Sequence, residues 1–340
     1  MIMKALVFHG PRNCVIEQRD PPRITQPDQV IVKVKMAGIC GSDMSTYAGA
    51  KSRKYPLVPG HEFVGEVYET GSSVSSVQVG DRVVVEPITY CGKCYACRAG
   101  RPNACRSVST AGAYHDGGMQ EYFLATEDKL FLLPGKMSFR SGALIEPFTI
   151  AAQVAMRTGI ERGKTVLYHG MGPIGLMSMR VAKAKGARCI ASELSRKRLE
   201  LASSFGADLV VNPGEQDLAS AVSAFTGGRG ADIVIDAAGF PSAISQSIDL
   251  VAQNGVVGNI CFGEYDTPVD LHKVVSKNIS IVGSRLQTYQ FQHVIDHYSD
   301  IIVEADRIIT DIYSIDDGPR AFELFGRCSE DTGKILIEFN

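Results

Sequence analysis

Three glycines that separate a predicted strand from a predicted helix constrain the fold of this chain more than any other feature. They stand at Gly170, Gly172 and Gly175, between an apolar run at 164–169 and a helical pattern at 173–187. In this context the first glycine permits a tight turn, the second lets the backbone approach a pyrophosphate, and the third lets helix and strand pack closely. The amide groups at the start of the helix face the phosphates. The motif therefore predicts a dinucleotide-binding site.

An acidic residue at the end of the next predicted strand indicates which dinucleotide binds. Glu193 stands 18 residues after Gly175, where a carboxylate accepts hydrogen bonds from ribose hydroxyls and repels a 2′-phosphate. This favours NAD over NADP. Arg196, Lys197 and Arg198 keep NADP open, because they would either pair with a 2′-phosphate or form the solvated start of a helix. A glycine turn in an ordinary α/β protein, with Glu193 on a solvated rim, is the competing interpretation.

The two halves of the chain have different patterns. From about residue 151, apolar runs alternate with helical patterns, which predicts βαβ units and a parallel sheet. Before that point, short and partly alternating strands separated by Gly and Pro predict a compact barrel-like domain. The closing run, 333–339, is strand-like, and we expect it to pair back onto the first domain.

Four cysteines lie within 15 residues of one another. Their spacing, Cys91-x-x-Cys94-x-x-Cys97 and then seven residues before Cys105, supplies four thiolates, a closed set typical of a structural zinc site. An iron–sulfur cluster is the rival interpretation, but its bacterial signature has a shorter last gap followed by proline, whereas Arg106 follows here. Four free buried cysteines at this spacing are the remaining alternative.

A second set of potential zinc ligands is dispersed along the first half of the chain. Cys40, His61, Glu62 and Glu146 provide a thiolate, an imidazole and carboxylates, which are the ligand types of a catalytic zinc with one position left for substrate. Each also has an ordinary structural interpretation: a core cysteine, a histidine in a turn, or a glutamate at the start of a helix. Local spacing does not establish that these residues converge.

At the segments Cys40–Asp43, Gly60–Glu62, the four cysteines and the glycine-rich loop, the chain resembles the medium-chain zinc-dependent alcohol dehydrogenases. It is most similar to the sorbitol, polyol and threonine dehydrogenase branch, because Glu146 stands where members outside this branch have cysteine. The resemblance runs nearly from end to end. It implies an α/β protein with a GroES-like β-barrel catalytic domain at 1–148, a Rossmann doubly wound domain at 149–285, and a segment at 286–340 that completes the catalytic domain.

The resemblance also implies roles for individual residues around a catalytic zinc. Cys40 and His61 would bind the ion, and Glu146 would be the third ligand, directly or through water. Glu62 would be a nearby ligand that exchanges on and off the zinc ion. Ser42 would form a hydrogen bond with the substrate hydroxyl, and Asp43 would orient His61 through its second ring nitrogen. With the four cysteines, this makes two zinc ions per chain, one catalytic and one structural.

Residues at the ends of several predicted strands and in the glycine-rich loop would line the cofactor. They are Gly170, Gly172, Pro173, Ile174, Gly175, Glu193, Arg198, Ile260, Cys261, Phe262, Ser284 and Arg285. Two features depart from many relatives. Ser45 stands where they have a proton-relaying histidine, and the bulky His169 and Met171 flank Gly170, where we expect them to pack.

Composition narrows the possible partners. Lysine and arginine number 35 against 37 aspartates and glutamates, a net charge of −2, so nothing favours nucleic acid or an anionic membrane. No run approaches the roughly 20 apolar residues of a membrane span, and the start lacks a signal-peptide pattern, so we expect a cytoplasmic protein. The resemblance implies a homo-oligomer, either a dimer or a tetramer.

Together these features predict a zinc-dependent oxidoreductase that transfers hydride between a secondary alcohol and NAD(P). The alcohol would be a polyol, a sugar acid or a related sugar derivative. Two alternatives are a zinc-containing, NAD-binding module without catalysis, and a zinc-free quinone or enoyl reductase on the same scaffold. The full set of zinc-ligand types argues against both.

Overall fold

The computed structural model describes residues 2–49, 54–262, 266–326 and 332–340. The chain divides into two compact units. Unit 1 combines Met1–Glu146 with Phe291–Asn340, and unit 2 is Pro147–Gln290. The chain therefore leaves unit 1 once and returns to it. No helix in these ranges is both long enough and apolar enough to cross a bilayer.

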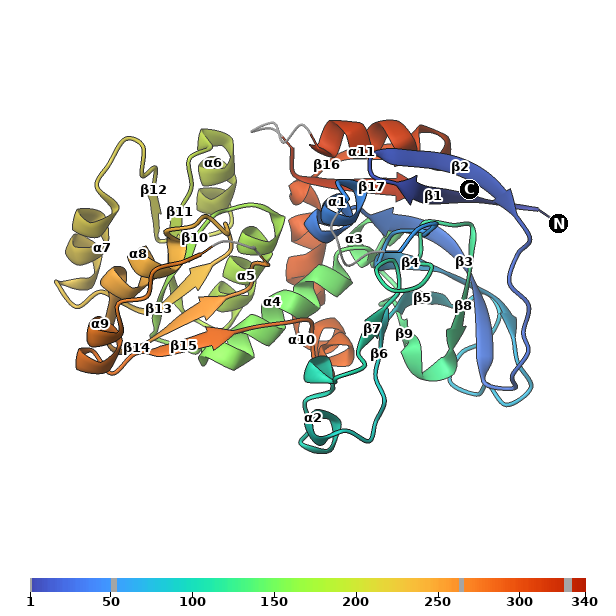
Figure 1. Ribbon diagram of the computed structural model, residues 1–340, viewed down its shortest axis with the longest axis horizontal. Helices are drawn as coiled ribbons and strands as arrows, with labels where there is room; N and C mark the ends of the chain where they lie inside the picture. The colour runs from blue at the N-terminus through green and yellow to red at the C-terminus, as the bar shows by residue number, and fades with distance from the viewer. Residues whose placement is uncertain (1, 50–53, 263–265, 327–331) are drawn as a thin grey trace. The chain divides into compact units, whose positions relative to one another are not determined.

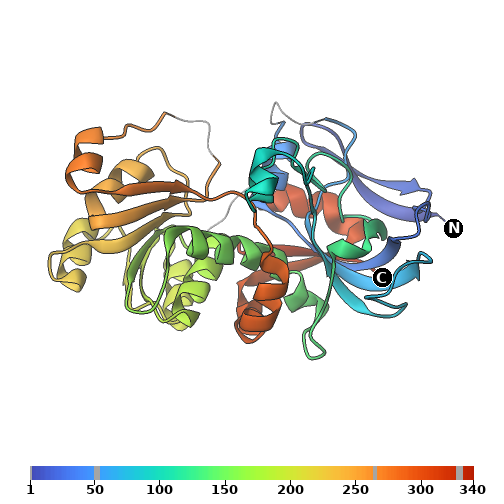
Figure 2. The ribbon, with the colours of Figure 1, turned by 90° about the horizontal axis from the view of Figure 1, so that it is seen from below.

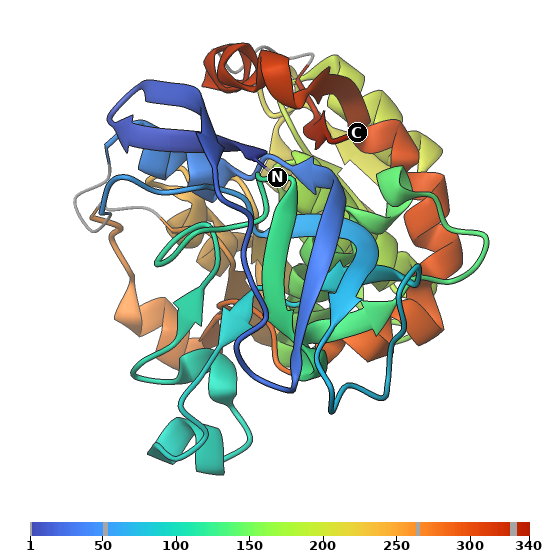
Figure 3. The same ribbon diagram turned by 90° about the vertical axis from the view of Figure 1, so that its right-hand side faces the viewer.

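Unit 1 is built on a largely antiparallel sheet of seven strands. The strand order is β16-β17-β3-β4-β5-β9, and β8 also pairs with β3. The closing strand β17 runs antiparallel to β3, with Leu336 opposite Gly38, so the end of the chain completes the sheet of the first unit as the sequence predicts. Figure 3 shows these strands with the β1–β2 hairpin beside them. The strands are β1 (Met3–Gly10), β2 (Asn13–Arg19), β3 (Gln29–Gly38), β4 (Glu62–Thr70), β5 (Arg82–Val85), β6 (Ile88–Thr89), β7 (Ser109–Thr110), β8 (Tyr122–Thr126), β9 (Leu130–Leu132), β16 (Ile309–Ser314) and β17 (Lys334–Glu338).

Helices in unit 1 are mostly short and sit at the ends of strands. An aromatic group formed by Phe8, Tyr47 and Phe322 packs α1 and α11 against the first strand, with Phe8 and Phe322 at 4.9 Å. Burying each large apolar side chain stabilises the fold by about 1.5–3 kcal/mol. The helices are α1 (Gly41–Tyr47), α2 (Tyr95–Arg98), α3 (Phe139–Gly142), α4 (Ile145–Thr158), which leads into unit 2, α10 (Gln290–Glu304) and α11 (Gly318–Gly326); 3₁₀ turns are η1 (Pro102–Ala104), η2 (Glu127–Lys129), η3 (Ala305–Ile308) and η4 (Ile315–Asp317).

Unit 2 contains a parallel sheet of six strands in the order β12-β11-β10-β13-β14-β15. This is the Rossmann order, in which the chain reverses direction across the sheet between β10 and β13. Every residue of β10 is buried, as expected for the central strand of a parallel sheet covered on both faces. The strands are β10 (Thr165–His169), β11 (Arg188–Ser192), β12 (Leu209–Val211), β13 (Ala231–Asp236), β14 (Val251–Asn259) and β15 (Ser280–Gly283).

Helices cover both faces of this parallel sheet. Figure 2 shows α5 and α6, in green, on one side of the strands, and α8 and α9, in orange, on the other. On the face covered by α8 and α9, apolar helix residues such as Ile248 meet strand residues such as Leu167 and Val234 in one core. The helices are α5 (Pro173–Ala184), α6 (Arg196–Ser204), α7 (Leu218–Thr226), α8 (Ala243–Leu250) and α9 (Leu271–Ser276).

Candidate metal centres and nucleotide site

Two adjacent antiparallel strands explain why Cys40 and His61 meet. β3 ends at Gly38 directly opposite Glu62, the first residue of β4. Cys40, which caps α1 just after β3, therefore lies beside His61 and Glu62 at the start of β4. One ligand atom from each of these three residues lies within 4.8 Å of the other two. His61 and Glu62 are buried and Cys40 is half-buried, so the three side chains form a largely buried cluster of zinc-type ligands, called the metal pocket below.

Residues of the first turn of α1 orient the imidazole of His61. The Oδ1 atom of Asp43 lies 3.5 Å from Nδ1 of His61, and its Oδ2 atom accepts a hydrogen bond from the Cys40 amide at 2.9 Å. The hydroxyl of Ser42 lies 3.4 Å from Nε2 of His61. Burial lowers the pKa of His61, but the charges of Asp43 and Cys40 outweigh burial and raise this pKa well above its ordinary value. The negative charges of Asp43 and Cys40 that raise this pKa would equally attract a metal cation in place of the proton.

Glu62 is paired with a lysine that the sequence analysis did not identify. Nζ of Lys334, the first residue of β17, donates a hydrogen bond to Oε1 of Glu62 at 2.6 Å and another to the Ile39 carbonyl at 3.1 Å. Both charged side chains are almost fully buried. Gly38 makes room for the pair, since a Cβ atom there would overlap the Glu62 carboxylate. The sequence signal for this pair is a lysine at the start of an apolar strand, here buried on both faces, because a buried positive charge requires an acidic partner.

Glu146 lies beside this group without belonging to its closest set of ligand atoms. It is the second residue of α4 and is buried. Burial raises the pKa of Glu146 to about 7, opposed by the positive charge of His61 and reinforced by the negative charge of Glu62. The structure thus brings Cys40, His61 and Glu62 together and leaves Glu146 close enough to interact with their charges.

The four cysteines converge in a segment that extends away from the sheet of unit 1, drawn in teal in Figures 1 and 3. Their sulfur atoms all lie within 4.8 Å of one another, with Cys94 to Cys97 and Cys91 to Cys105 each at 3.5 Å. Backbone amides of Cys97 and Arg106 lower the pKa of Cys94 to about 6, which favours the thiolate form. Four converging sulfurs and no open position fit a structural zinc ion.

In unit 2, the glycine-rich loop has the backbone geometry that the motif predicts. Gly170 has φ of +88°, and a Cβ atom there would press against Ala238. A Cβ atom on Gly175 would overlap the carbonyl oxygen of Gly170, so only glycine allows α5 to start this close to β10. Gly172 and Pro173 form the N-cap and first position of α5, which leaves the first amides of that helix directed at a ligand.

The carboxylate of Glu193 holds the rim of the same loop. It accepts hydrogen bonds from the amides of Met171 at 2.9 Å and Leu194 at 2.8 Å. Arg198 on α6 approaches it at 3.8 Å, while Arg196 pairs with Glu215 at 2.9 Å. Arg196, one of the three basic residues that could pair with the 2′-phosphate of NADP, is therefore paired instead with an acid that lies away from the loop.

The remaining candidate cofactor residues lie at the same edge of the sheet. Those at 260–262 follow β14, and Ser284 and Arg285 follow β15, so all stand at the carboxyl ends of parallel strands, where α/β proteins bind nucleotides. Phe262 is 84% exposed and Ser284 is buried. His169 and Met171 are also buried; His169 packs edge-on against Phe240 at 5.8 Å, and burial lowers its pKa to about 4.

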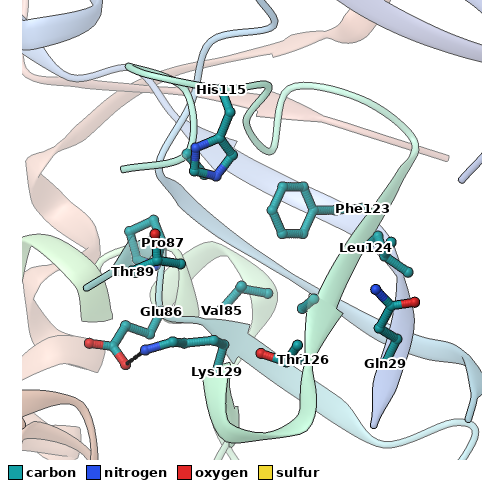
Figure 4. Close-up of a pocket in the computed structure, with 12 residues that line it drawn as sticks. Gln29, Val85, Glu86, Pro87, Thr89, His115, Phe123, Leu124, Thr126 and Lys129 are labelled. Carbon is teal, nitrogen blue, oxygen red and sulfur yellow. Dashed lines mark hydrogen bonds and ion pairs between the residues drawn. The ribbon is translucent and has the colours of Figure 1, made fainter. Parts of the chain in front are cut away.

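A small hollow in unit 1 contains none of the predicted site residues (Figure 4). It encloses about 170 Å³. His115 lies at one end, and the ion pair of Lys129 and Glu86, joined at 3.1 Å, lies at the other. Phe123 and Val85 form part of its apolar wall.

Comparison with known proteins agrees with the fold of both units. Residues 26–135 match the model of the alcohol dehydrogenase GroES-like domain, and residues 173–300 match that of the zinc-binding dehydrogenases. Sorbitol dehydrogenase of Bacillus subtilis is 34% identical over 98% of this chain and 97% of its own. The chain belongs to the medium-chain zinc-dependent alcohol dehydrogenase family. It is an NAD(P)-dependent oxidoreductase, and neither the non-catalytic module nor the zinc-free reductase describes it.

Two further relatives extend the comparison. D-arabitol-phosphate dehydrogenase of Enterococcus avium is 34% identical over 92% of this chain and 90% of its own. Among solved structures, the RspB alcohol dehydrogenase of Escherichia coli CFT073 in complex with NADH has a TM-score of 0.93 and 33% identity, and covers 99% of each chain. The resemblance of this chain to the family therefore extends over both units.

Proposed function

We propose that this dehydrogenase oxidises a secondary hydroxyl group of a polyol or sugar derivative with NAD⁺, and that Cys40, His61 and Glu62 hold its catalytic zinc. The observation that carries the proposal is the convergence of one ligand atom from each of these three side chains within 4.8 Å in a largely buried part of unit 1. Relatives named for sorbitol and for an arabitol phosphate support the substrate class. The four cysteines would hold a second, structural zinc.

The side chains around the ligands would orient the substrate and move its proton. Bound at this site, a zinc ion supplies Lewis-acid chemistry that lowers the pKa of the substrate hydroxyl. Ser42, whose hydroxyl lies 3.4 Å from the His61 ring, would accept a hydrogen bond from that hydroxyl. Glu146, with a pKa raised to about 7 by burial, is suited to hold the released proton near neutral pH. Asp43 would keep the His61 ring in one orientation.

Charge at the rim of the glycine-rich loop supports NAD as the preferred cofactor. Glu193 is held at the end of β11 by loop amides, where its negative charge would face the adenosine ribose and oppose a 2′-phosphate. Arg198 is paired with this carboxylate at 3.8 Å, so its positive charge is partly neutralised. The residues at Gly170–Gly175, at 260–262 and at 284–285 would line the rest of the cofactor.

We also propose that the chain forms a homo-oligomer through the edge of the parallel sheet. β15 is the last strand of that sheet, and its Ile281 is 43% exposed. An apolar edge strand of this kind pairs readily with a second copy of itself. Sedimentation of the wild-type chain and of Ile281→Lys tests this, with a smaller particle expected for the variant and an unchanged particle contradicting the edge as the interface.

The function is tested by initial rates of NAD⁺ and NADP⁺ reduction on a panel of polyols, sugar phosphates, aldonic acids and L-threonine. Each rate is measured with and without a zinc chelator. We expect chelator-sensitive reduction of NAD⁺ on polyols or their phosphates. Activity confined to L-threonine, or activity that survives complete loss of zinc, would contradict the proposal.

A further inference from the structure

Helix α10, labelled in Figure 1, includes two exposed histidines, His293 and His297. Its apolar residues, among them Phe291, Val294 and Tyr298, are buried, and Phe291 stacks on Phe131 at 5.2 Å. This packing fixes the rotation of the helix. The opposite face of the helix, which includes His293 and, one turn later, His297, is exposed.

The two histidines have the spacing and geometry of a chelating pair. His293 and His297 are four residues apart on a continuous helix, so their side chains lie one above the other. Their ring centroids are 4.4 Å apart and the ring planes differ by 33°. Two nitrogens on one tetrahedral zinc ion, each at about 2.05 Å from it, are about 3.3 Å apart, a separation that rings this close can provide. Histidines at i and i+4 bind zinc in this way in other helical sites.

A hydrogen bond within the pair selects the nitrogen available to a metal ion. Nδ1 of His297 lies 2.9 Å from the carbonyl oxygen of His293. A carbonyl oxygen can only accept, so Nδ1 carries the proton and donates it, which leaves the lone pair of this ring on Nε2. The same arrangement, in which one ring nitrogen donates to a backbone carbonyl, orients metal-binding histidines generally.

A carboxylate lies on the same stripe of the helix. Asp300 is seven residues after His293 and three after His297, and all three side chains are exposed. Positions i, i+4 and i+7 share one face of an α-helix. The negative charge of Asp300 therefore adds to the attraction for a cation, while Asp296 on the flank accepts a hydrogen bond from Gln292 at 2.8 Å.

From this geometry we propose that His293 and His297 form a third metal site, which binds one divalent transition ion such as Zn²⁺, Ni²⁺ or Cu²⁺ on the surface of α10. Imidazole suits these ions and suits Mg²⁺ or Ca²⁺ poorly. The site shares no residue with the cysteine segment or with the pocket of Cys40 and His61. Because it links two consecutive turns, a bound ion stabilises α10 against fraying at its start.

The proposal is tested by titrating Ni²⁺ into tag-free enzyme that already contains zinc, with binding followed by calorimetry and zinc content checked before and after. We expect one Ni²⁺ per chain without loss of zinc. His293→Gln and His297→Gln should each weaken Ni²⁺ binding at least tenfold, because each removes one of the two imidazoles. His272→Gln, which changes an exposed histidine of α9 without an i+4 partner, should leave binding unchanged and serves as the matched control.

Three results would overturn the proposal. They are the absence of Ni²⁺ binding to zinc-loaded enzyme, displacement of zinc with the same stoichiometry as Ni²⁺ uptake, and equal affinity in both histidine variants and the wild type. Since the substituted side chains are exposed, the variants should unfold at the same temperature as the wild type when no Ni²⁺ is present. Ni²⁺ should raise that temperature only in the wild type and the His272→Gln variant.

Discussion

At the scale of single residues, the buried pair of Lys334 and Glu62 is the most consequential contact of the candidate metal pocket. The two side chains are almost fully buried, and the closest alternative partner of the lysine is the Ile39 carbonyl at 3.1 Å. Removing one member of such a pair leaves an uncompensated charge in an apolar environment, which is far more costly than the net value of the pair itself.

We therefore expect Lys334→Met to lower the free energy of unfolding by about 3 kcal/mol in chelator-treated protein. The loss should be smaller in zinc-loaded protein, since a bound cation would compensate Glu62. Lys35→Met is the matched control, because Lys35 forms a partly exposed pair with Glu66 at 3.7 Å that is worth at most about 1 kcal/mol. Urea unfolding of both variants, with and without zinc, measures the two free energies of unfolding. Equal losses of stability in the two variants would show that the buried Lys334 pair is worth no more than the partly exposed Lys35 pair.

The charge of Glu193 is the second contact that a single substitution can test. Glu193→Gln retains an oxygen that can accept hydrogen bonds from the loop amide of Met171 but removes the negative charge. We expect KM for NAD⁺ to rise roughly tenfold, as loss of one charged hydrogen bond implies, and the preference for NAD⁺ over NADP⁺ to fall. Glu200→Gln, which changes an exposed acid of α6, is the control. Steady-state kinetics with NAD⁺ and NADP⁺ measures the preference of both variants. An unchanged preference in Glu193→Gln would argue against a role for this charge in cofactor selection.

At the scale of elements, the cysteine segment has little packing of its own. Residues 91–105 form only a four-residue helix, α2, and the 3₁₀ turn η1, and among these four cysteines only Cys105 is buried. A zinc ion bound by the four cysteines, as proposed, would therefore supply much of the folding free energy of this segment.

Cys94→Ser should accordingly reduce zinc from two ions per chain to one and expose the segment to protease. The matched control is Cys14→Ser, because Cys14 is a half-buried thiol of β2 outside both clusters. Elemental analysis together with limited proteolysis measures both effects. Two zincs in Cys94→Ser would mean that these cysteines do not form the structural site.

The elements were more predictable from the sequence than the contacts between them. The glycine-rich loop, Glu193 and the cysteine spacing are local patterns, so the Rossmann sheet and the thiolate group could be predicted directly. The pocket of Cys40 and His61 depends on the pairing of β3 with β4, which no local spacing encodes, and the family resemblance supplied it. Lys334 was missed because it reaches the pocket from the end of the chain, 272 positions after Glu62.

At the scale of the whole molecule, the proposed chemistry and the proposed cofactor binding belong to different units. The side chains of Cys40 and His61 are part of unit 1, whereas the glycine-rich loop and Glu193 are part of unit 2. Each unit has its own hydrophobic core. A change confined to the metal pocket should therefore leave the nucleotide loop folded.

His61→Ala tests this separation. We expect turnover to fall below detection, because the pocket loses its imidazole ligand, while the affinity for NADH changes less than about threefold. His115→Ala is the matched control, since His115 lines the separate hollow of unit 1 and contacts Ser109 rather than a metal ligand; it should retain both turnover and zinc. NADH fluorescence titration, turnover and zinc content are measured on the same samples. Full turnover in His61→Ala would contradict the assignment of the catalytic zinc, whereas a parallel loss of NADH binding would show that the two units do not act independently.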